Sequence, residues 1–570
     1  MIFFLNIDRY IYKMYDRVDT KREAIVALIC SFADYTIIVQ GGMIMSKKMT
    51  KGILAVFFMA VCLITTQPQK VQAAQEIPIG SAEELQKMES NPSGSYYLTN
   101  DITVPANTVL FKSMDNPFTG TLDGKGYGIN GYTYSADTWT EFAGLFGYAQ
   151  NATFKNLNMN NVNISLRGSG NACALVGYPS ACLLENITTS GAISVSGTAS
   201  YAAGIAIGAG ENTTFKKCEN KADITVVAYD ITNTADPDEV ESQEGRACGI
   251  ANSAIDCTAE QCSNSGKITA NGDLQWASEE IGAYGLFNYI TIISESNNTG
   301  AITATNISTG YATDGTVYAC GVAEHADKME TCYNTAKITA SNANKNIGTI
   351  AVGIVNSTSG NKWATITKCY NTGDVQLKGV AGGKSKSRIV SGAGGIGGLE
   401  VLSITESYNT GKVTANVSSG QLEVGGISAF VRNVRNCYNT AKVSASAGAS
   451  GHIGGIAGFQ DSLPKGKKGS KDAAACNYNI GTVKAGKKAS KGSIIGRYEI
   501  LGIPDKAAVY DNYYKSGKPY GTKNITWEPY FAKAIKTSSM TAGKCSKLSS
   551  KYWVYSSKHK RMILKNNKEK

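Results

Sequence analysis

The sequence predicts an all-β protein, a parallel β-helix of about eleven stacked repeats with a short capping helix at the start of the stack. Three observations lead to this fold. The 570 residues include 61 Gly and only 11 Pro, a composition typical of an all-β array. Two short words recur through the chain. Around one of them, residues alternate with a period of two, as in a half-buried strand.

The first word is C-Y-N or a close variant of it. It occurs in "ETCYNTAKITA" (330–340), "TKCYNTGDVQL" (367–377), "TESYNTGKVTA" (405–415) and "RNCYNTAKVSA" (435–445). The cysteine position recurs every 30 to 44 residues, at Asn156, Asn186, Cys218, Cys262, Ser296, Cys332, Cys369, Ser407, Cys437, Asn477 and Asn512. Periods of 20 to 50 residues indicate solenoids, propellers or arrays.

The second word precedes the first in each repeat and begins with a small residue followed by an aliphatic one. Examples are "GLFG" (144–147), "ALVG" (174–177) and "GIAG" (455–458). A unit of about 35 residues with two or three strands cannot bury an apolar face alone, so copies must stack. A propeller blade would need about four strands. Stacked coils of a parallel β-helix fit better, with equivalent side chains about 4.8 Å apart.

The alternation assigns side chains to the two faces of the strand. In "CYNTAKITA", Cys332, Asn334 and Ile338 lie on the inward face. Because Ser and Asn also occupy the cysteine position, it requires a small inward residue, and a free Cys packs as a small hydrophobe. Parallel, in-register side chains on neighbouring coils do not suit a disulfide, for example between Cys332 and Cys369.

The asparagine of the first word also faces inward, where a buried amide needs hydrogen-bond partners. We expect stacked copies to bond one another in a ladder and to adopt the left-handed conformation at a corner of the coil. The expected members are Asn220, Asn264, Asn334, Asn371, Asn409, Asn439 and Asn479.

The tyrosines of the first word should point outward and form a strip along the side of the stack. Aromatic rings in a row are a candidate contact surface for sugars or proteins. The alternative is that they only cover the corner and shield the backbone. The predicted strip contains Tyr333, Tyr370, Tyr408, Tyr438 and Tyr478.

The N-terminal region carries a processing signal. Residues 45–74 combine Lys47, Lys48 and Lys51 with an apolar run of about 12 residues and a small-residue cleavage site, which predicts a secretory signal peptide. The run is too short to span a bilayer, so we expect cleavage and no transmembrane anchor. Residues 1–44 are expected to lie upstream of the true start, at Met45, with Met43 as the alternative.

The remaining chain divides into three parts. Residues 75–117 form an N-terminal cap, in which Ser81 and Glu84 have capping-box spacing and predict a short helix. Residues 118–527 hold the repeats. Residues 528–570 form a C-terminal cap and basic tail, where Trp553 and Tyr555 are expected to close the last coil.

Both words together resemble the GLUG repeats of secreted and surface proteins of bacteria. The entry segment "FTGTLDGKGYGI" (118–129) also looks like the start of such an array. The resemblance implies a right-handed parallel β-helix in an exported, often adhesive or wall-associated protein. GLUG repeats also occur beside the catalytic region of some immunoglobulin A metallopeptidases, but His325, His452 and His559 form no HExxH motif here, so that activity is not carried over.

The charge is uneven along the chain. Residues 461–570 contain 24 Lys and Arg against 7 Asp and Glu. Basic runs of this kind favour anionic polymers such as wall polymers or acidic glycans, or they are solubilising loops. Nucleic acid is not expected for an exported chain. The candidate contacts are Lys465, Lys467, Lys468, Lys484, Lys487, Lys488, Lys560 and Arg561.

We expect no catalytic, metal or cofactor site. There is no CxxC pair, the acidic stretch at 230–245 is expected to be a solvated insertion, and Asp and Glu do not recur as a facing set between residues 262 and 450. The predicted function is a monomeric, non-enzymatic protein, secreted or non-covalently wall-associated, that contacts glycans or host proteins. The alternatives are a polysaccharide-degrading lyase or hydrolase, and an inert stalk.

Overall fold

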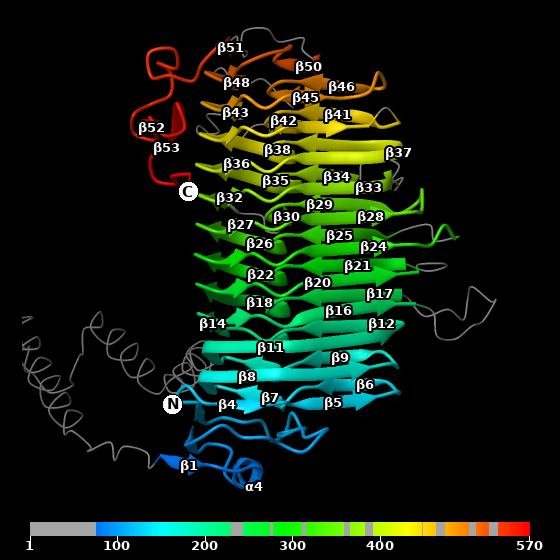
Figure 1. The fold of residues 1–570 in the computed structure, drawn as a ribbon, viewed down its shortest axis with the longest axis vertical. Helices are drawn as coiled ribbons and strands as arrows, with labels where there is room; N and C mark the ends of the chain where they lie inside the picture. The colour runs from blue at the N-terminus through cyan, green and yellow to red at the C-terminus, as the bar shows by residue number, and fades with distance from the viewer. Residues whose placement is uncertain are drawn as a thin grey trace, which may run out of the picture. The chain divides into compact units, whose positions relative to one another are not determined.

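The computed structural model is all-β, a parallel β-solenoid of about ten turns, as predicted (Figure 1). It describes residues 76–229, 243–273, 278–310, 315–357, 365–381, 391–446, 448–462, 474–500, 509–523 and 534–569. The predicted signal peptide and the extension before it lie outside these residues. Every described strand pair that joins two coils is parallel, for example Ile302 to Ile338 and Ile338 to Val375.

In each coil, one longer strand lies before the second word and another lies after it. The strand before the word is β9 (Gly170–Cys173), β12 (Ala199–Ala203), β17 (Gln243–Cys248), β21 (Ser278–Tyr284), β25 (Thr316–Cys320), β29 (Gly348–Val352), β34 (Ser391–Gly394), β41 (Ser450–Gly454) or β46 (Ala489–Gly492). The strand after it is β10 (Val176–Ser180), β13 (Ala206–Ala209), β18 (Ala251–Glu260), β22 (Phe287–Ser294), β26 (Ala323–Glu330), β30 (Val355–Ser357), β35 (Gly397–Thr405), β38 (Ser428–Arg435), β42 (Ala457–Ser462) or β47 (Ile495–Ile500).

The first word forms a two-residue strand, which is followed by the third long strand of the coil. The short strands include β15 (Glu219–Asn220), β19 (Ser263–Asn264), β23 (Asn297–Asn298), β27 (Tyr333–Asn334), β32 (Tyr370–Asn371), β36 (Tyr408–Asn409), β39 (Tyr438–Asn439) and β44 (Tyr478–Asn479). The third strands are β8 (Thr153–Leu166), β11 (Leu183–Gly197), β16 (Asp223–Ala228), β20 (Ile268–Gly272), β24 (Ile302–Asn306), β28 (Ile338–Asn342), β33 (Val375–Ala381), β37 (Val413–Gly425), β40 (Val443–Ala445) and β45 (Val483–Lys484). Two of these, β8 and β11, also include the first word, and β37 continues into the next coil.

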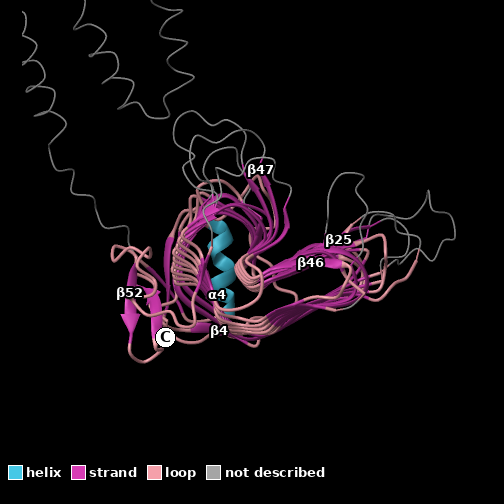
Figure 2. Cartoon of the chain, turned by 90° about the horizontal axis from the view of Figure 1, so that it is seen from above, coloured by secondary structure: helices cyan, strands magenta, loops and turns pink. Residues whose placement is uncertain are grey.

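Seen along the stack, each coil has a round part and a flat part that ends near β25 and β46 (Figure 2). The predicted capping helix is present as α4 (Ala82–Gln86), followed by the 3-10 turn η1 (Lys87–Ser90). The Ser81 hydroxyl accepts a hydrogen bond from the Glu84 amide. Leu85 and Met88 are fully buried against the core of the first coils, so this segment caps the round part.

The glycine of the second word is required because neighbouring coils approach closely there. A Cβ on Gly353 would lie 2.1 Å from the carbonyl oxygen of Gly395 on the next coil. The same Cβ would lie 2.6 Å from Cγ of Asn371, which belongs to the first word. The two words therefore meet in space, although Gly353 and Asn371 are 18 residues apart along the chain.

The asparagine ladder is confirmed, and it contains one more member than expected. Every amide before Asn479 donates one hydrogen bond to the amide oxygen on the next coil, at 2.7–2.9 Å. Each amide also donates to the carbonyl oxygen of the residue two positions later. Asn298 fills the gap in the predicted set, because the fifth repeat reads "SNN" in place of "CYN". All these amides are fully buried, so the ladder satisfies groups that would otherwise be costly inside the coil.

One expected detail of this corner is wrong. The ladder asparagines lie in short strands, and the left-handed conformation occurs three residues earlier, at Thr331 (φ 59), Lys368 (φ 55) and Asn436 (φ 52). The reason is that the sharp turn must precede the strand, so that the amides themselves stay in register. The cysteines of the described chain are buried and free, as the packing interpretation predicted.

Replacing Asn371 with Ala should lower the free energy of unfolding by about 1–3 kcal/mol, because the amides of Asn334 and Asn409 each lose a buried partner. Urea unfolding followed by circular dichroism measures the effect. The matched control is Asn416→Ala, since Asn416 is exposed, and it should change stability by less than about 0.5 kcal/mol. Equal effects of the two substitutions would contradict a structural role for the ladder.

Candidate functional site

The predicted tyrosine strip exists as a stacked column, but most of it is buried. Neighbouring rings from Tyr333 to Tyr478 lie 4.8–5.0 Å apart and within 10° of parallel. Tyr370 is 7% exposed, and Tyr408, Tyr438 and Tyr478 are 0% exposed. The column continues at Tyr513, which is also buried. The expectation of an exposed strip is therefore wrong for every member except Tyr333, which is half-buried.

The covering element is the C-terminal strap, which we define as residues 537–569. It contains the antiparallel hairpin of β52 (Trp553–Ser556) and β53 (Arg561–Leu564), which packs against β39 and β44 at the side of the stack (Figure 1). The Trp553 ring is 5.5 Å from that of Tyr478. Apolar strap residues complete the cluster with the tyrosines: Met540, Cys545, Leu548, Met562 and Leu564.

Specific hydrogen bonds fix the register of the strap on the coils. Trp553 Nε1 donates to Asn436 Oδ1 at 3.1 Å, and the Tyr478 hydroxyl donates to the Met562 carbonyl at 2.6 Å. Asn567 Nδ2 donates to the carbonyls of Cys369 and Glu406. The strap therefore binds several successive coils along the side of the stack. The expectation that Trp553 and Tyr555 close the last coil is wrong, because Trp553 packs laterally and Tyr555 is 43% exposed.

A second outward column lies where the chain bends at the second word, and we call it the inner corner. It consists of the outward side chains of the strands on either side of the bend, which contact one another. The Phe142 ring is 5.5 Å from Tyr148, and the His452 ring is 6.0 Å from Phe459. A separate apolar cluster lines this corner: Cys173, Ala203, Ile207, Cys248, Tyr284, Cys320, Ile350 and Val352.

The middle of the inner corner holds a network of charged groups. Arg246 pairs with Glu244 and binds Glu280 at 2.9 Å through Nη2 and 3.1 Å through Nε. The Tyr284 hydroxyl contacts Glu280 and lies 2.9 Å from Glu324 Oε2. The Tyr284 hydroxyl carries a single proton, so it can donate to only one of these two carboxyl groups at a time.

The surroundings of Glu280 favour the protonated form of its carboxyl group. Burial raises its pKa above the ordinary value, and the Glu324 carboxylate raises it further, while Arg246 opposes the change. Next to Glu324, His325 contacts Glu324 at 3.3 Å and its Nδ1 lies 2.6 Å from the Ser357 hydroxyl. The network thus extends over successive coils from β17 to β30.

The network corrects the expectation that acidic residues do not gather between residues 262 and 450. Glu280 and Glu324 meet there, and Glu244, from the end of the acidic stretch, joins them; the rest of that stretch, residues 230–242, lies outside the described residues. An alignment of the repeats could have predicted this cluster, because Glu244 and Glu280 both lie five residues before the first glycine of the second word. The side chains of Glu244, Glu280 and Glu324 are only 11%, 11% and 6% exposed, respectively. Glu244 and Glu280 both bind Arg246, and the Tyr284 hydroxyl lies between Glu280 and Glu324.

A basic hollow of about 570 Å³ lies further along the stack and brings together Lys487 and Lys488, two of the predicted basic contacts. Both lysines are exposed. The hollow crosses three successive coils, from β37 through β41 to β46. Its other lining residues are Gln421, Ser450, Gly451, His452, Ala489 and Ser490. It can therefore offer two ammonium groups together with hydroxyl and amide groups.

Beneath the basic hollow, His452 Nδ1 lies 2.7 Å from Oε1 of the buried Glu423. Burial raises the pKa of Glu423 to about 7, and the bond to His452 partly counteracts this. The imidazole is thereby held in one orientation at the wall of the hollow.

The other predicted basic residues do not gather at this hollow. Lys484 and Lys560 are exposed elsewhere. Arg561 is mostly enclosed and binds both carboxylate oxygens of Glu569 at 2.6 and 2.7 Å, so its expected role as a free contact is wrong. Lys465, Lys467 and Lys468 lie outside the described residues.

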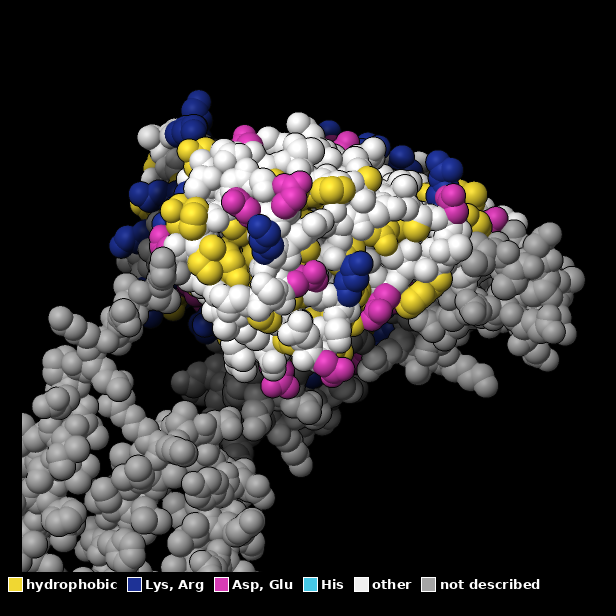
Figure 3. All heavy atoms as spheres, turned by 90° about the horizontal axis from the view of Figure 1, so that it is seen from below, with side chains coloured by type: hydrophobic (Ala, Val, Ile, Leu, Met, Phe, Trp, Pro, Cys, Tyr) yellow, Lys and Arg dark blue, Asp and Glu magenta, His cyan; other side chains and the backbone are white. Residues whose placement is uncertain are grey.

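The remaining surface of the described chain shows no single chemical character. Seen from the N-terminal end, basic and acidic side chains lie among hydrophobic ones (Figure 3). Within the described ranges, no group of three His, Cys, Asp or Glu side chains could hold a metal ion. No helix among the described residues is long and apolar enough to cross a membrane.

Comparisons with known proteins assign neither a family nor an activity to this chain. No protein-family model matches the sequence, and no curated protein matches it. One solved structure is similar, a putative immunoglobulin A1 protease from Bacteroides ovatus, at 13% identity and a TM-score of 0.21 over 86% of this chain and 93% of that chain. A likeness of this size carries no argument about activity. The resemblance to GLUG repeats therefore stays a prediction.

Replacing Trp553 with Ala should lower the free energy of unfolding by about 3–5 kcal/mol, because the ring fills the contact between strap and tyrosine column. Chemical unfolding measures this, and tyrosine quenching by acrylamide should increase. Tyr555→Ala is the matched control, since Tyr555 lies on the same strand and is 43% exposed. If both variants behaved like the wild type, the strap would not be docked on the column.

The pH dependence of stability should report the Glu280 carboxyl. Its folded pKa lies above the unfolded value, so its contribution is fully present below about pH 4.5 and is lost as pH rises through the folded pKa. Between pH 5 and 9 the melting temperature of the wild type should therefore fall more than that of Glu280→Gln. Glu185→Gln, on a glutamate paired with Lys216, serves as the control. Parallel curves for wild type and Glu280→Gln would show that Glu280 is not protonated in the fold.

Proposed function

We propose that this chain is an extracellular, non-enzymatic binding protein of GLUG type that holds an anionic polymer in the basic hollow. The observation that carries the proposal is the convergence of Lys487 and Lys488 on one hollow with the hydroxyls of Ser450 and Ser490. Ammonium groups attract carboxylate or phosphate groups, and hydroxyls and amides can bond the neutral parts of the same polymer.

The predicted signal peptide and the exposed lysines together suggest where the protein acts and which ligands it meets. A chain with a secretory signal would meet acidic glycans or wall polymers outside the cell. Attachment through a few exposed lysines would be non-covalent and sensitive to salt, because exposed charges are screened within about 8–10 Å at physiological ionic strength. The tyrosine column is not part of this proposal, since the strap covers it.

The binding should depend on the two lysines of the hollow. Replacing Lys487 and Lys488 with Ser should reduce retention on an acidic polysaccharide or teichoic acid at low salt by about tenfold, since two charge contacts of about 0.5–1 kcal/mol each are lost. Affinity chromatography with a salt gradient measures the change. The control, Lys87→Ser with Lys112→Ser, removes the same charge from exposed positions at the other end of the stack.

Three outcomes separate the alternatives. Equal loss of retention in both double variants would indicate a general charge effect and would overturn the role of the hollow. New reducing ends or unsaturated products after incubation would indicate a polysaccharide-degrading enzyme. Absence of binding to every polyanion, glycan and matrix protein tested would leave an inert stalk.

A further inference from the structure

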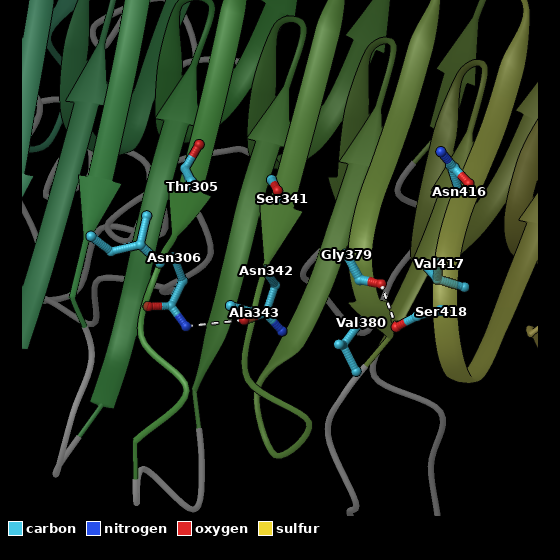
Figure 4. A pocket seen from close by; sticks show the side chains of 11 residues that line it. Thr305, Asn306, Ser341, Asn342, Ala343, Gly379, Val380, Asn416, Val417 and Ser418 are labelled. Carbon is cyan, nitrogen blue, oxygen red and sulfur yellow. Dashed lines mark hydrogen bonds between the residues drawn. The ribbon is translucent and has the colours of Figure 1, made fainter.

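A second hollow, separate from the basic one, crosses four coils, at the ends of β24, β28 and β33 and within β37 (Figure 4). We call it the four-coil hollow. It is shallow and open, and its volume is about 610 Å³. Strand β37 contributes Asn416 to this hollow and Gln421, beyond the bend at Gly420, to the basic hollow. The two hollows are therefore distinct surfaces.

The floor of the four-coil hollow is rigid and its amides are already satisfied. Asn306 Nδ2 donates to Asn342 Oδ1 at 3.0 Å, and Asn342 Nδ2 donates to the carbonyls of Asn344 and Ile347. Both asparagines are 1% exposed. They form a second, shorter asparagine ladder, which fixes the backbone of the strands that carry the lining residues.

The wall carries polar side chains that are not used within the described chain. Thr305, Ser341 and Asn416 lie in one column, with Lys378 between the last two. The described residues form no side-chain hydrogen bond with these two hydroxyls or with this amide, and all three groups are at least partly exposed. Hydroxyls and amides can both donate and accept hydrogen bonds. The column thus presents one such group on each of three coils.

Apolar side chains lie directly beside these polar groups. Ile307 is 67% exposed, which is unusual for an aliphatic residue of this size, and Ala343 and Val380 are half-buried. None of the residues that line the hollow carries a charge. Lys378 shares the column but does not line the hollow. The surface therefore combines aliphatic patches with neutral groups that donate and accept.

We propose that the four-coil hollow binds an uncharged saccharide chain that runs along the stack. A sugar ring offers C–H faces to Ile307 and Val380 and hydroxyls to Thr305, Ser341 and Asn416. The column repeats at the coil spacing of about 4.8 Å, so a linear chain can contact Thr305 and Ser341 on neighbouring coils and Asn416 beyond Lys378. Such shallow sites obtain their affinity from several weak contacts, which favours an oligomer over a single sugar.

The test uses the purified protein and a panel of neutral linear oligosaccharides of increasing length, with acidic oligosaccharides as a second set. Calorimetry should detect at least one neutral ligand, with affinity that rises with length and changes little with salt. The triple variant Thr305→Val, Ser341→Ala, Asn416→Ala should bind it at least about tenfold more weakly, because three hydrogen bonds to the saccharide are lost.

The matched control is Thr303→Val, Thr339→Ala, Thr414→Ala. These residues lie on the same strands, two positions earlier, and also point outward, but they do not line the hollow. The control should keep full affinity, and circular dichroism should confirm that both variants fold. Equal loss in both triple variants, or no binding of any neutral oligosaccharide, would overturn the proposal.

The outcome is independent of the basic hollow. Binding restricted to acidic oligosaccharides and abolished by salt would also overturn the neutral-saccharide site, and it would support the basic hollow instead. Loss of polyanion binding in the Lys487 and Lys488 variant, with neutral binding intact, would leave the four-coil hollow unaffected.

Discussion

The structure depends on one repeated contact, in which an asparagine of one word packs against a glycine of the other inside the coil. The amide of Asn371 lies where a Cβ on Gly353 would be, and it bonds the amides of the coils before and after it. Without the glycine, the neighbouring carbonyl could not approach. Without the amide, the turn after the first word would lose its buried partner. The two words are therefore one structural unit, and both have to be repeated for coils to stack.

The tyrosine column shows how a repeated outward residue can serve the fold. Tyrosines occupy this position only from Tyr333 onward, and this is the stretch along which the strap packs. Earlier coils carry Glu219, Ser263 and Asn297 at the same position, in the short strands β15, β19 and β23. The strap thus explains the aromatic residues. A ligand would instead bind a face that no other part of the described chain covers.

Two of these faces differ in chemistry although they share strand β37. The basic hollow gathers lysines and hydroxyls, and the four-coil hollow gathers neutral polar and aliphatic groups. At the inner corner, Arg246 offsets the charges of Glu244 and Glu280. A solenoid can carry such different surfaces because each column of outward side chains varies without disturbing the inward ladder that holds the coils together.

The sequence by itself determined the parallel β-helix, the inward asparagines, the buried cysteines and the outward direction of the tyrosines. These features follow from local periodicity, because a period of two assigns faces and a repeat of 30 to 44 residues assigns register. Only the tertiary structure decided what covers each outward column. Trp553 binds Asn436 across 117 residues, and Glu280 meets Glu324 through the Tyr284 hydroxyl at a bend of the coil. Such contacts join residues from different coils, and no spacing along the chain specifies them.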